Sequence, residues 1–128
     1  VGDNEIFGEF KGALAEQCVQ QELRTTCELS PCYWASEKKN AKAEIDFLCT
    51  LKGNIIPIEV KGGNSIRARS LLVYCQRFQP RHAIRTSLHP YSESLIPFKT
   101  PLHPHTDCTL TELPLYAISQ LPAILTTP

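Results

Sequence analysis

The sequence predicts one α/β domain, in which helices flank a mixed central sheet, and three observations support this prediction. First, residues 5–24 and 66–78 repeat apolar side chains at helical spacing. Second, residues 43–51 and 55–61 alternate apolar and polar side chains, as half-buried strands do. Third, 128 residues with 42% hydrophobic and 20% charged side chains suit a domain with a buried core and exclude a disordered chain. We therefore take residues 1–128 as a single domain.

Residues 5–24 are predicted to form the first helix because their apolar side chains recur at positions i, i+3, i+7 and i+11. These positions are held by Phe7, Phe10, Leu14 and Cys18, and Val19 and Leu23 widen the stripe. Asn4 precedes the stripe and is a suitable N-cap. A second helix is predicted over residues 66–78, and Pro80 ends it.

The strands are predicted from β-branched and aromatic runs between turn residues. Residues 32–36 form a short strand, and residues 82–87 form another. Residues 43–51 and 55–61 form a β-hairpin around the turn Lys52-Gly53-Asn54. A helix, three strands, a helix and a strand in this order indicate a mixed sheet with helices packed against it.

Alternation along the first hairpin strand predicts which side chains share a face. Ile45, Phe47 and Cys49 are expected on one face, and Glu44 and Asp46 on the other.

The chain changes character from about residue 88. Seven of the ten prolines lie at residue 90 or later, so residues 88–128 are expected to form a mostly irregular extension of a core over residues 5–90. Residues 110–125 regain an apolar pattern that is compatible with a final strand and a short helix.

The charges cancel overall but are unevenly distributed. Thirteen bases balance thirteen acids, which argues against a generally basic nucleic-acid-binding surface. Residues 1–59 hold ten acids and six bases (−4), residues 60–90 hold six bases and no acid (+6), and residues 91–128 hold three acids and one base (−2). An acidic metal site and a basic phosphate-binding face are therefore able to lie side by side.

The strongest candidate site is formed by Asp46, Glu59 and Lys61. Glu59 and Lys61 lie two residues apart on one strand and share a face, and the hairpin brings the Asp46 strand beside them. Two carboxylates suit Mg²⁺, and a lysine beside them holds a water or stabilises negative charge on a phosphate. The first helix is able to add Glu16. The alternative is that these charges form only the solvated face of a hairpin.

These residues resemble a known pattern. Glu16 in a leading helix, Asp46 in Glu-Ile-Asp-Phe-Leu, and Glu59 and Lys61 in Ile-Glu-Val-Lys resemble the PD-(D/E)XK nuclease superfamily. The chain resembles more closely the C-terminal DUF4143 domain of bacterial and archaeal AAA+-type ATPases. The motifs that carry this resemblance are Gly12-Ala-Leu-Ala-Glu16, Tyr33-Trp34, Glu44-Ile-Asp-Phe47, Ile58-Glu-Val-Lys-Gly62, Ser70-Leu71 and Ile84-Arg-Thr-Ser87.

The resemblance implies a restriction-endonuclease-like core with about four strands in the order α-β-β-β-α-β. It implies Asp46 and Glu59 as ligands of Mg²⁺ or Mn²⁺, Lys61 as the catalytic lysine and Glu16 as an accessory acid. The implied activity is metal-dependent cleavage of phosphodiester bonds in nucleic acid, with DNA as the expected substrate. Ile45 departs from the superfamily pattern, which has a proline before the aspartate.

The resemblance also implies a partner, the N-terminal ATPase domain of a longer protein. The chain contains no G-x-x-x-x-G-K-[ST] motif, so that ATPase part is expected to lie outside it. The alternative function is a non-enzymatic interaction or regulatory module of the ATPase that uses the same fold.

The basic sector offers candidate nucleic-acid contacts. Five arginines are expected to follow a phosphate backbone, although spaced arginines also simply decorate exposed helices. They are Arg67, Arg69, Arg77, Arg81 and Arg85.

Two further groups have competing interpretations. Tyr33 and Trp34 either stack on a base or belong to the core. His103, His105 and Cys108 have donors for a transition metal but lack a regularly spaced second pair, unless Cys27 and Cys32 supply it.

The cysteines indicate the compartment. Six cysteines are irregularly spaced, and Cys18, Cys49 and Cys75 fall in apolar stretches, so we expect buried reduced thiols rather than disulfides. The first residues lack a signal-peptide pattern, and no apolar run reaches the length of a membrane span. A cytoplasmic protein without membrane contact is therefore expected.

Overall fold

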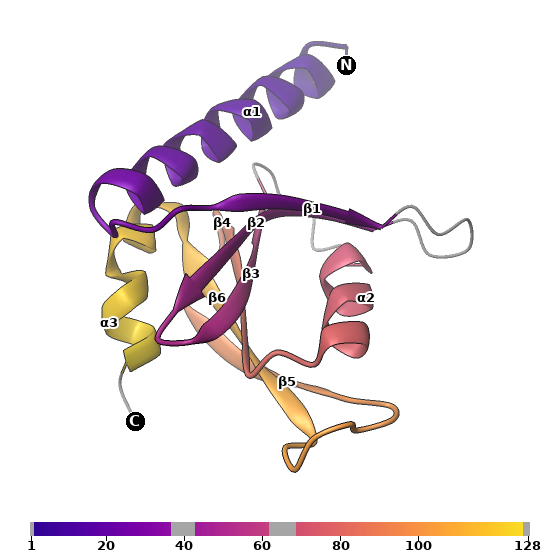
Figure 1. Cartoon of the computed structure of the whole chain (residues 1–128). Helices are drawn as coiled ribbons and strands as arrows, with labels where there is room; N and C mark the ends of the chain where they lie inside the picture. The colour runs from indigo at the N-terminus through magenta and orange to yellow at the C-terminus, as the bar shows by residue number, and fades with distance from the viewer. Residues whose placement is uncertain (1, 37–42, 62–68, 127–128) are drawn as a thin grey trace.

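The computed structural model describes residues 2–36, 43–61 and 69–126, in which helices cover both faces of one mixed sheet (Figure 1). The elements are α1 (Gly2–Thr25), β1 (Cys32–Ser36), β2 (Ala43–Leu51), β3 (Asn54–Val60), α2 (Arg69–Phe78), β4 (His82–Ser87), β5 (Ser92–Pro97), β6 (Asp107–Pro114), the 3₁₀ helix η1 (Leu115–Gln120) and α3 (Leu121–Thr126). The predicted order α-β-β-β-α-β is confirmed through β4. The predicted second helix is observed from Arg69, and residues 66–68 lie outside the described part.

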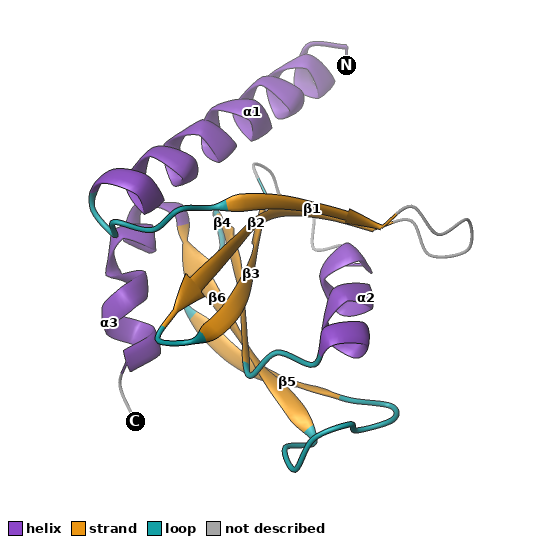
Figure 2. Ribbon diagram, viewed as in Figure 1, coloured by secondary structure: helices purple, strands orange, loops and turns teal. Residues whose placement is uncertain are grey.

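The sheet has six strands in the order β1-β2-β3-β4-β6-β5 (Figure 2). Strand β3 pairs with β4, and β4 with β6, in parallel, whereas the other neighbours are antiparallel. The expected count of about four strands is wrong, because residues 92–97 and 107–114 form β5 and β6. The final strand and short helix expected within residues 110–125 are confirmed as the second half of β6 and as α3. Pro97 and Pro114 end these strands, where a missing backbone N–H interrupts little pairing.

The predicted β2–β3 hairpin is confirmed, with Leu51 paired to Asn54 across the turn. Lys52 and Gly53 occupy the two turn positions with φ values of 50° and 80°. Two consecutive positive φ angles are typical of a type I′ turn, whose twist matches that of the flanking strands.

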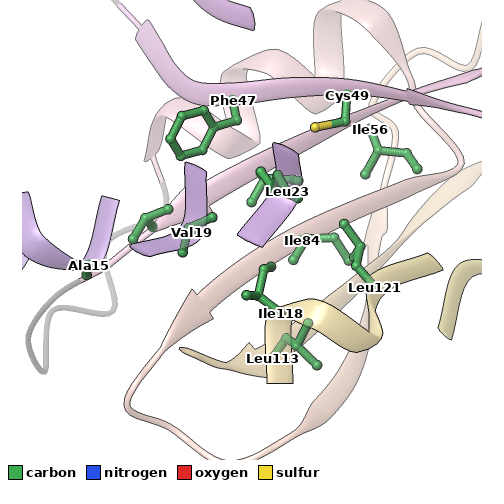
Figure 3. Close-up of a cluster of buried hydrophobic side chains, with 12 residues drawn as sticks. Ala15, Val19, Leu23, Phe47, Cys49, Ile56, Ile84, Leu113, Ile118 and Leu121 are labelled. Carbon is green, nitrogen blue, oxygen red and sulfur yellow. The ribbon is translucent and has the colours of Figure 1, made fainter. Parts of the chain in front are cut away.

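Two hydrophobic clusters sandwich the sheet. One joins the sheet to α1, η1 and α3, and Figure 3 shows its side chains; the other joins the sheet to α2. The adjacent residues Ala83 and Ile84 of β4 belong to different clusters, so the two clusters lie on opposite faces. The expected common face of Ile45, Phe47 and Cys49 is wrong, because Ile45 packs on the α2 side and the other two on the α1 side.

Helix α1 packs on the sheet through Ala15, Val19 and Leu23, which are all buried. These residues follow an i, i+4, i+8 row, so they stand one above another on one side of the helix. Leu14 is 45% exposed and Cys18 is exposed. The predicted stripe through Leu14 and Cys18 is therefore wrong, while its extension to Val19 and Leu23 is confirmed; Phe7 and Phe10 lie outside the described side chains.

Trp34 connects β1 to α2 through aromatic contacts. Its ring meets those of Tyr74 and Phe78 edge-on, at centroid distances of 5.1 and 5.6 Å. Tyr74 and Phe78 also contact each other at 4.7 Å. Edge-to-face pairs of this kind add about 1 kcal/mol each beyond the burial of apolar area. The core interpretation of Trp34 is therefore confirmed.

Two glutamines hold the connection between β5 and β6 against α2. The Gln76 amide donates to Pro97 O and accepts from Lys99 N, both at 2.8 Å. The buried Gln79 amide donates to Thr100 O at 2.8 Å and accepts from Leu102 N at 2.7 Å. Each side chain thus satisfies both a carbonyl and an N–H of a segment that has no strand partner there.

All six cysteines are free thiols. Cys49 and Cys75 are buried as predicted, and Cys108 is buried as well. Burial raises the pKa of Cys49 to about 12, so this thiol is unreactive at neutral pH. The expected burial of Cys18 is wrong, because it lies on the side of α1 that faces away from the sheet.

Candidate functional site

A β-bulge positions Asp46. The pairing of β1 with β2 jumps from Trp34–Ile45 to Cys32–Leu48. Two β2 residues, Asp46 and Phe47, therefore lie opposite the single β1 residue Tyr33. A bulge of this kind re-aims a side chain, and this one lies where the regular pairing of β2 with β3 ends, at Phe47.

Asp46 is anchored to the end of β3. Its Oδ2 atom accepts a 2.8 Å hydrogen bond from the backbone N–H of Val60. This bond links β2 to β3 beyond their last regular pair, Phe47–Ile58, and it fixes the carboxylate beside the neighbouring acids Glu16 and Glu59.

Glu59 is a buried carboxyl group, with only 6% of the residue exposed. Burial, followed by a hydrogen bond with Asp46 and the Asp46 charge, raises its pKa to about 8 against the opposing effect of Lys61. Two carboxyl groups this close share a proton more readily than they carry two charges. Glu59 is thus largely protonated at neutral pH.

Lys61 lies beside Glu59, with 3.7 Å between Nζ and Glu59 Oε1. Its backbone N–H donates to Thr86 O at 2.8 Å, which extends the β3–β4 pairing by one residue and fixes the start of the lysine side chain. The other carboxyl oxygen, Glu59 Oε2, is buried and accepts no hydrogen bond from the described residues. Such an orphaned oxygen is costly unless a proton or a cation satisfies it.

Helix α1 adds Glu16 to the same group. Partial burial raises the pKa of Glu16, and the charge of Asp46 and a hydrogen bond with it raise it too, while Lys61 lowers it. Asp46 therefore interacts with both glutamates, and so does Lys61. The structure brings Glu16, Asp46, Glu59 and Lys61 together, although they come from one helix and two strands.

An open groove of about 640 Å³ leads to Asp46 between α1 and β2. Glu16 lines it, and so do residues that the sequence did not single out for this site: Glu44, Gln17 and Gln20. Tyr33, 62% exposed, stands at its edge, where desolvation and a hydrogen bond with Glu44 raise the pKa of the phenol. These residues meet only because α1 crosses over β2, which a local pattern does not show.

The donor set fits a hard divalent cation. Mg²⁺ needs only one or two protein carboxylates because it keeps several of its waters. Asp46 and Glu59 supply oxygen ligands, and Glu59 Oε2 is a buried oxygen that lacks a donor among the described residues. Across the described ranges, no three His, Cys, Asp or Glu side chains are grouped as a metal site, so the fit is to a two-carboxylate, water-rich site.

The candidate arginines are scattered. Arg69 opens α2 and is exposed, and the exposed Arg77 lies 5.1 Å from the Phe78 ring centre. Arg85 forms a bidentate ion pair with Glu112 of β6, at 3.1 and 2.9 Å. This pairing holds the Arg85 guanidinium against the sheet. Arg67 lies outside the described residues.

The predicted histidine and cysteine donors do not gather. His103 and His105 stack on each other, while Cys108 is buried beneath α2. Cys27 contacts the carbonyls of Ile118 and Ser119 on the opposite face of the sheet. A transition-metal site therefore has no ligand group in the described part of the chain.

A protein-family model matches most of the sequence. The family described as "Domain of unknown function (DUF4143)" matches residues 11–100. This range includes every member of the acidic group and ends at the connection that follows β5. No curated protein matches the sequence. None of the helices in the described ranges is both long and apolar enough to cross a bilayer.

Proposed function

The chain belongs to the DUF4143 family, and from its carboxylate arrangement we propose that it is a magnesium-dependent nuclease domain with a restriction-endonuclease-like core. One observation carries this proposal: Asp46 lies between Glu16 and Glu59 and is anchored to Val60 N, while Lys61 pairs with Glu59. Several acids and one lysine lie together where the regular pairing of β2 with β3 ends. Such a group suits the cleavage of phosphodiester bonds in nucleic acid.

Asp46 and Glu59 would hold the metal. When bound, Mg²⁺ or Mn²⁺ polarises the phosphate and lowers the pKa of a coordinated water. Glu59 must release its proton to become a metal ligand. Because its pKa is about 8, a cation competes with this proton for the carboxylate at neutral pH. Metal binding is therefore expected to strengthen from pH 6 to pH 8.

Lys61 and Glu16 act around these ligands. The Lys61 ammonium, 3.7 Å from Glu59 Oε1, is placed to stabilise negative charge that develops on the phosphate. Glu16, whose pKa is raised, is able to keep a proton longer than an ordinary glutamate and so serves as the accessory acid.

DNA is the proposed substrate, and the exposed arginines Arg69 and Arg77 of α2 are its proposed phosphate contacts. Arg85 is not proposed as a direct phosphate contact, because its guanidinium is bound to the Glu112 carboxylate. The proposed protein partner is an ATPase domain of a longer protein, as the similarity to DUF4143 domains of AAA+-type ATPases implies.

Cleavage assays test the proposal. Plasmid DNA, single-stranded DNA and RNA are incubated with the full chain and Mg²⁺ or Mn²⁺. We expect cleavage that Asp46→Ala and Lys61→Ala each reduce at least 100-fold. The matched variants Glu28→Ala and Lys52→Ala, which change exposed charges away from the site, retain it. Cleavage that persists in both site variants means that the assignment is wrong.

A second candidate function is an interaction or regulatory module of the ATPase. It is favoured by an apolar groove of about 710 Å³ beside α2, lined by Leu72, Ile96 and Pro97 and flanked by Arg77 and Lys99. In this case the acidic group is structural. Calorimetric titration with Mg²⁺ and Mn²⁺ separates the two functions: heat that Asp46→Asn abolishes supports the nuclease, and no heat supports the module.

A further inference from the structure

A second cleft lies at the other end of the sheet from the acidic group. It has a volume of about 430 Å³ and is formed by the β2–β3 turn, the end of α2 and the connection between β5 and β6. Ile55, near the start of β3, lines this cleft, whereas Glu59 lies four residues further along the strand. At about 3.3 Å per residue, the two sites are roughly 13 Å apart along β3.

The cleft is basic, and we call it the basic cleft. Arg81 lines it and forms no ion pair with any residue in the described ranges. Its backbone is fixed, because Thr109 N donates to Arg81 O at 2.9 Å. None of the described side chains that line the cleft is an Asp or a Glu. An anion is therefore attracted to Arg81 without competition from a neighbouring carboxylate.

Two imidazole rings form one wall of the basic cleft. His105 Nε2 lies 3.1 Å from Gln79 O, and because a carbonyl oxygen only accepts, this nitrogen carries the proton. His103 stacks on His105 with 5.4 Å between ring centres and 9° between ring planes. The Phe98 ring meets His105 at 5.7 Å. The imidazole pair is thus held in a defined orientation: Gln79 O engages the N–H of His105, and His103 places a second ring in the cleft that Arg81 lines.

The opposite wall is apolar and partly exposed. Phe78 is 45% exposed and Ile55 is 54% exposed, and the buried ring of Tyr74 lies between α2 and the sheet. A flat, partly apolar ring would remove this surface from water, at about 25 cal/mol per Å² buried. The cleft volume lies within the range of small-molecule sites.

We propose that the basic cleft binds a mononucleotide. The phosphate contacts Arg81 and the imidazole N–H of His103, and the base lies against Phe78 and Ile55. Arg81 and the two histidines come from parts of the sequence that seemed unrelated, a basic sector and a proline-rich extension, and the fold joins them in one cleft. This site is independent of the nuclease proposal.

Isothermal titration of the full chain without divalent metal tests the site, with AMP, adenosine and inorganic phosphate as probes. We expect AMP to bind at least about tenfold more tightly than either adenosine or phosphate. Only AMP has both a phosphate for Arg81 and a base for the apolar wall. Arg81→Gln and His103→Ala should each weaken AMP binding about tenfold. Arg24→Gln, which removes an exposed arginine at the end of α1, should leave it unchanged.

Three results would overturn the proposal. The first is AMP binding no tighter than that of phosphate, and the second is equal AMP affinity in Arg81→Gln and Arg24→Gln. The third is loss of AMP binding in Asp46→Asn, which would move the nucleotide to the acidic group. Retained AMP binding in Asp46→Asn, together with the Arg81→Gln loss, supports the basic cleft even if no nuclease activity is found.

Discussion

Asp46 Oδ2 and the backbone N–H of Val60 form a 2.8 Å hydrogen bond across the point where β2 and β3 cease to pair regularly. The bond links the bulged residue of one strand to the residue between Glu59 and Lys61 on the other. The position of the acidic group therefore depends on a backbone contact as well as on the identities of its side chains.

Asp46→Asn should lower the pKa of Glu59 from about 8 towards its ordinary value. The Asp46 carboxylate raises that pKa through its hydrogen bond and its charge, and the substitution removes the charge. Burial, the largest cause, remains, so the pKa should stay above 4.5. NMR titration of the glutamate side-chain carboxyl carbons measures it. Asp107→Asn, on β6, is the control, and an unchanged Glu59 titration in Asp46→Asn would refute the coupling.

Glu59→Gln should change how stability depends on pH. A buried carboxyl group with a raised pKa binds its proton in the folded state but not in the unfolded state between pH 4.5 and about 8. The free energy of unfolding of the wild type should therefore fall as pH rises through this window, by at most about 1.4 kcal/mol per pH unit.

Because glutamine does not titrate, the stability of Glu59→Gln relative to the wild type should increase from pH 5 to pH 8. Urea denaturation at both pH values measures the difference, with the exposed Glu28→Gln as a control. A constant difference between Glu59→Gln and wild type would show that Glu59 does not titrate in this range.

Glu112→Gln should destabilise the fold by about 1–3 kcal/mol at pH 7, because it leaves the half-buried Arg85 without its carboxylate. The hydrogen bonds from Arg85 are the main cause that lowers the pKa of Glu112. A carboxylate with a lowered pKa contributes stability above pH 4.5 that is lost as pH falls through the lowered value. The difference from wild type should thus shrink near pH 3. Thermal or urea denaturation at pH 7 and pH 3 checks this, and an equal difference at both would contradict it.

Gln79→Ala should free the connection between β5 and β6. The buried amide makes hydrogen bonds to Thr100 O and Leu102 N, and removing both should cost about 1–3 kcal/mol. Hydrogen exchange followed by NMR should show faster exchange of the Leu102 amide. Gln76→Ala is the matched control, because it should speed exchange at Lys99 and leave Leu102 protected. Equal protection of Leu102 in Gln79→Ala and wild type would mean that this amide does not hold the segment.

The sequence predicted most of the first half of the fold, because its helices and strands carry regular local patterns. The alternation of β2 predicted which residues are buried, yet it assigned Ile45 and Phe47 to one face. The bulge inserts an extra residue between them, so two residues of equal parity face opposite clusters. A bulge leaves no sign in the hydrophobic pattern, because both neighbours are buried either way.

Strand β5 was missed, and β6 was indicated only from residue 110, for a different reason. The prolines around them indicated irregular structure, but Pro97 and Pro114 stand at strand ends. Strand β6 pairs with β4, and the paired residues, such as His82 and Thr109, lie 27 positions apart in the chain. Pairing over that distance follows from the whole sheet and is not visible in a local segment.

The residues of the candidate site that belong to short sequence motifs were predictable. Those that depend on contacts between distant helices and strands were not. Asp46, Glu59 and Lys61 were indicated by strand alternation within one hairpin. The groove residues Gln17 and Gln20 were not, because they depend on how α1 crosses over β2. Similarly, only the folded chain shows that the Arg85 guanidinium is held by Glu112.

The single tryptophan of the chain, Trp34, stands against Tyr74 and Phe78 where β1 meets α2. Emission excited at 295 nm therefore comes from one site and reports whether α2 is seated on the sheet. Tyr74, with its ring centre 5.1 Å away, should pass its excitation to Trp34. Release of α2 should then restore tyrosine emission and shift the tryptophan spectrum to the red, which makes the docking of this helix measurable without a label.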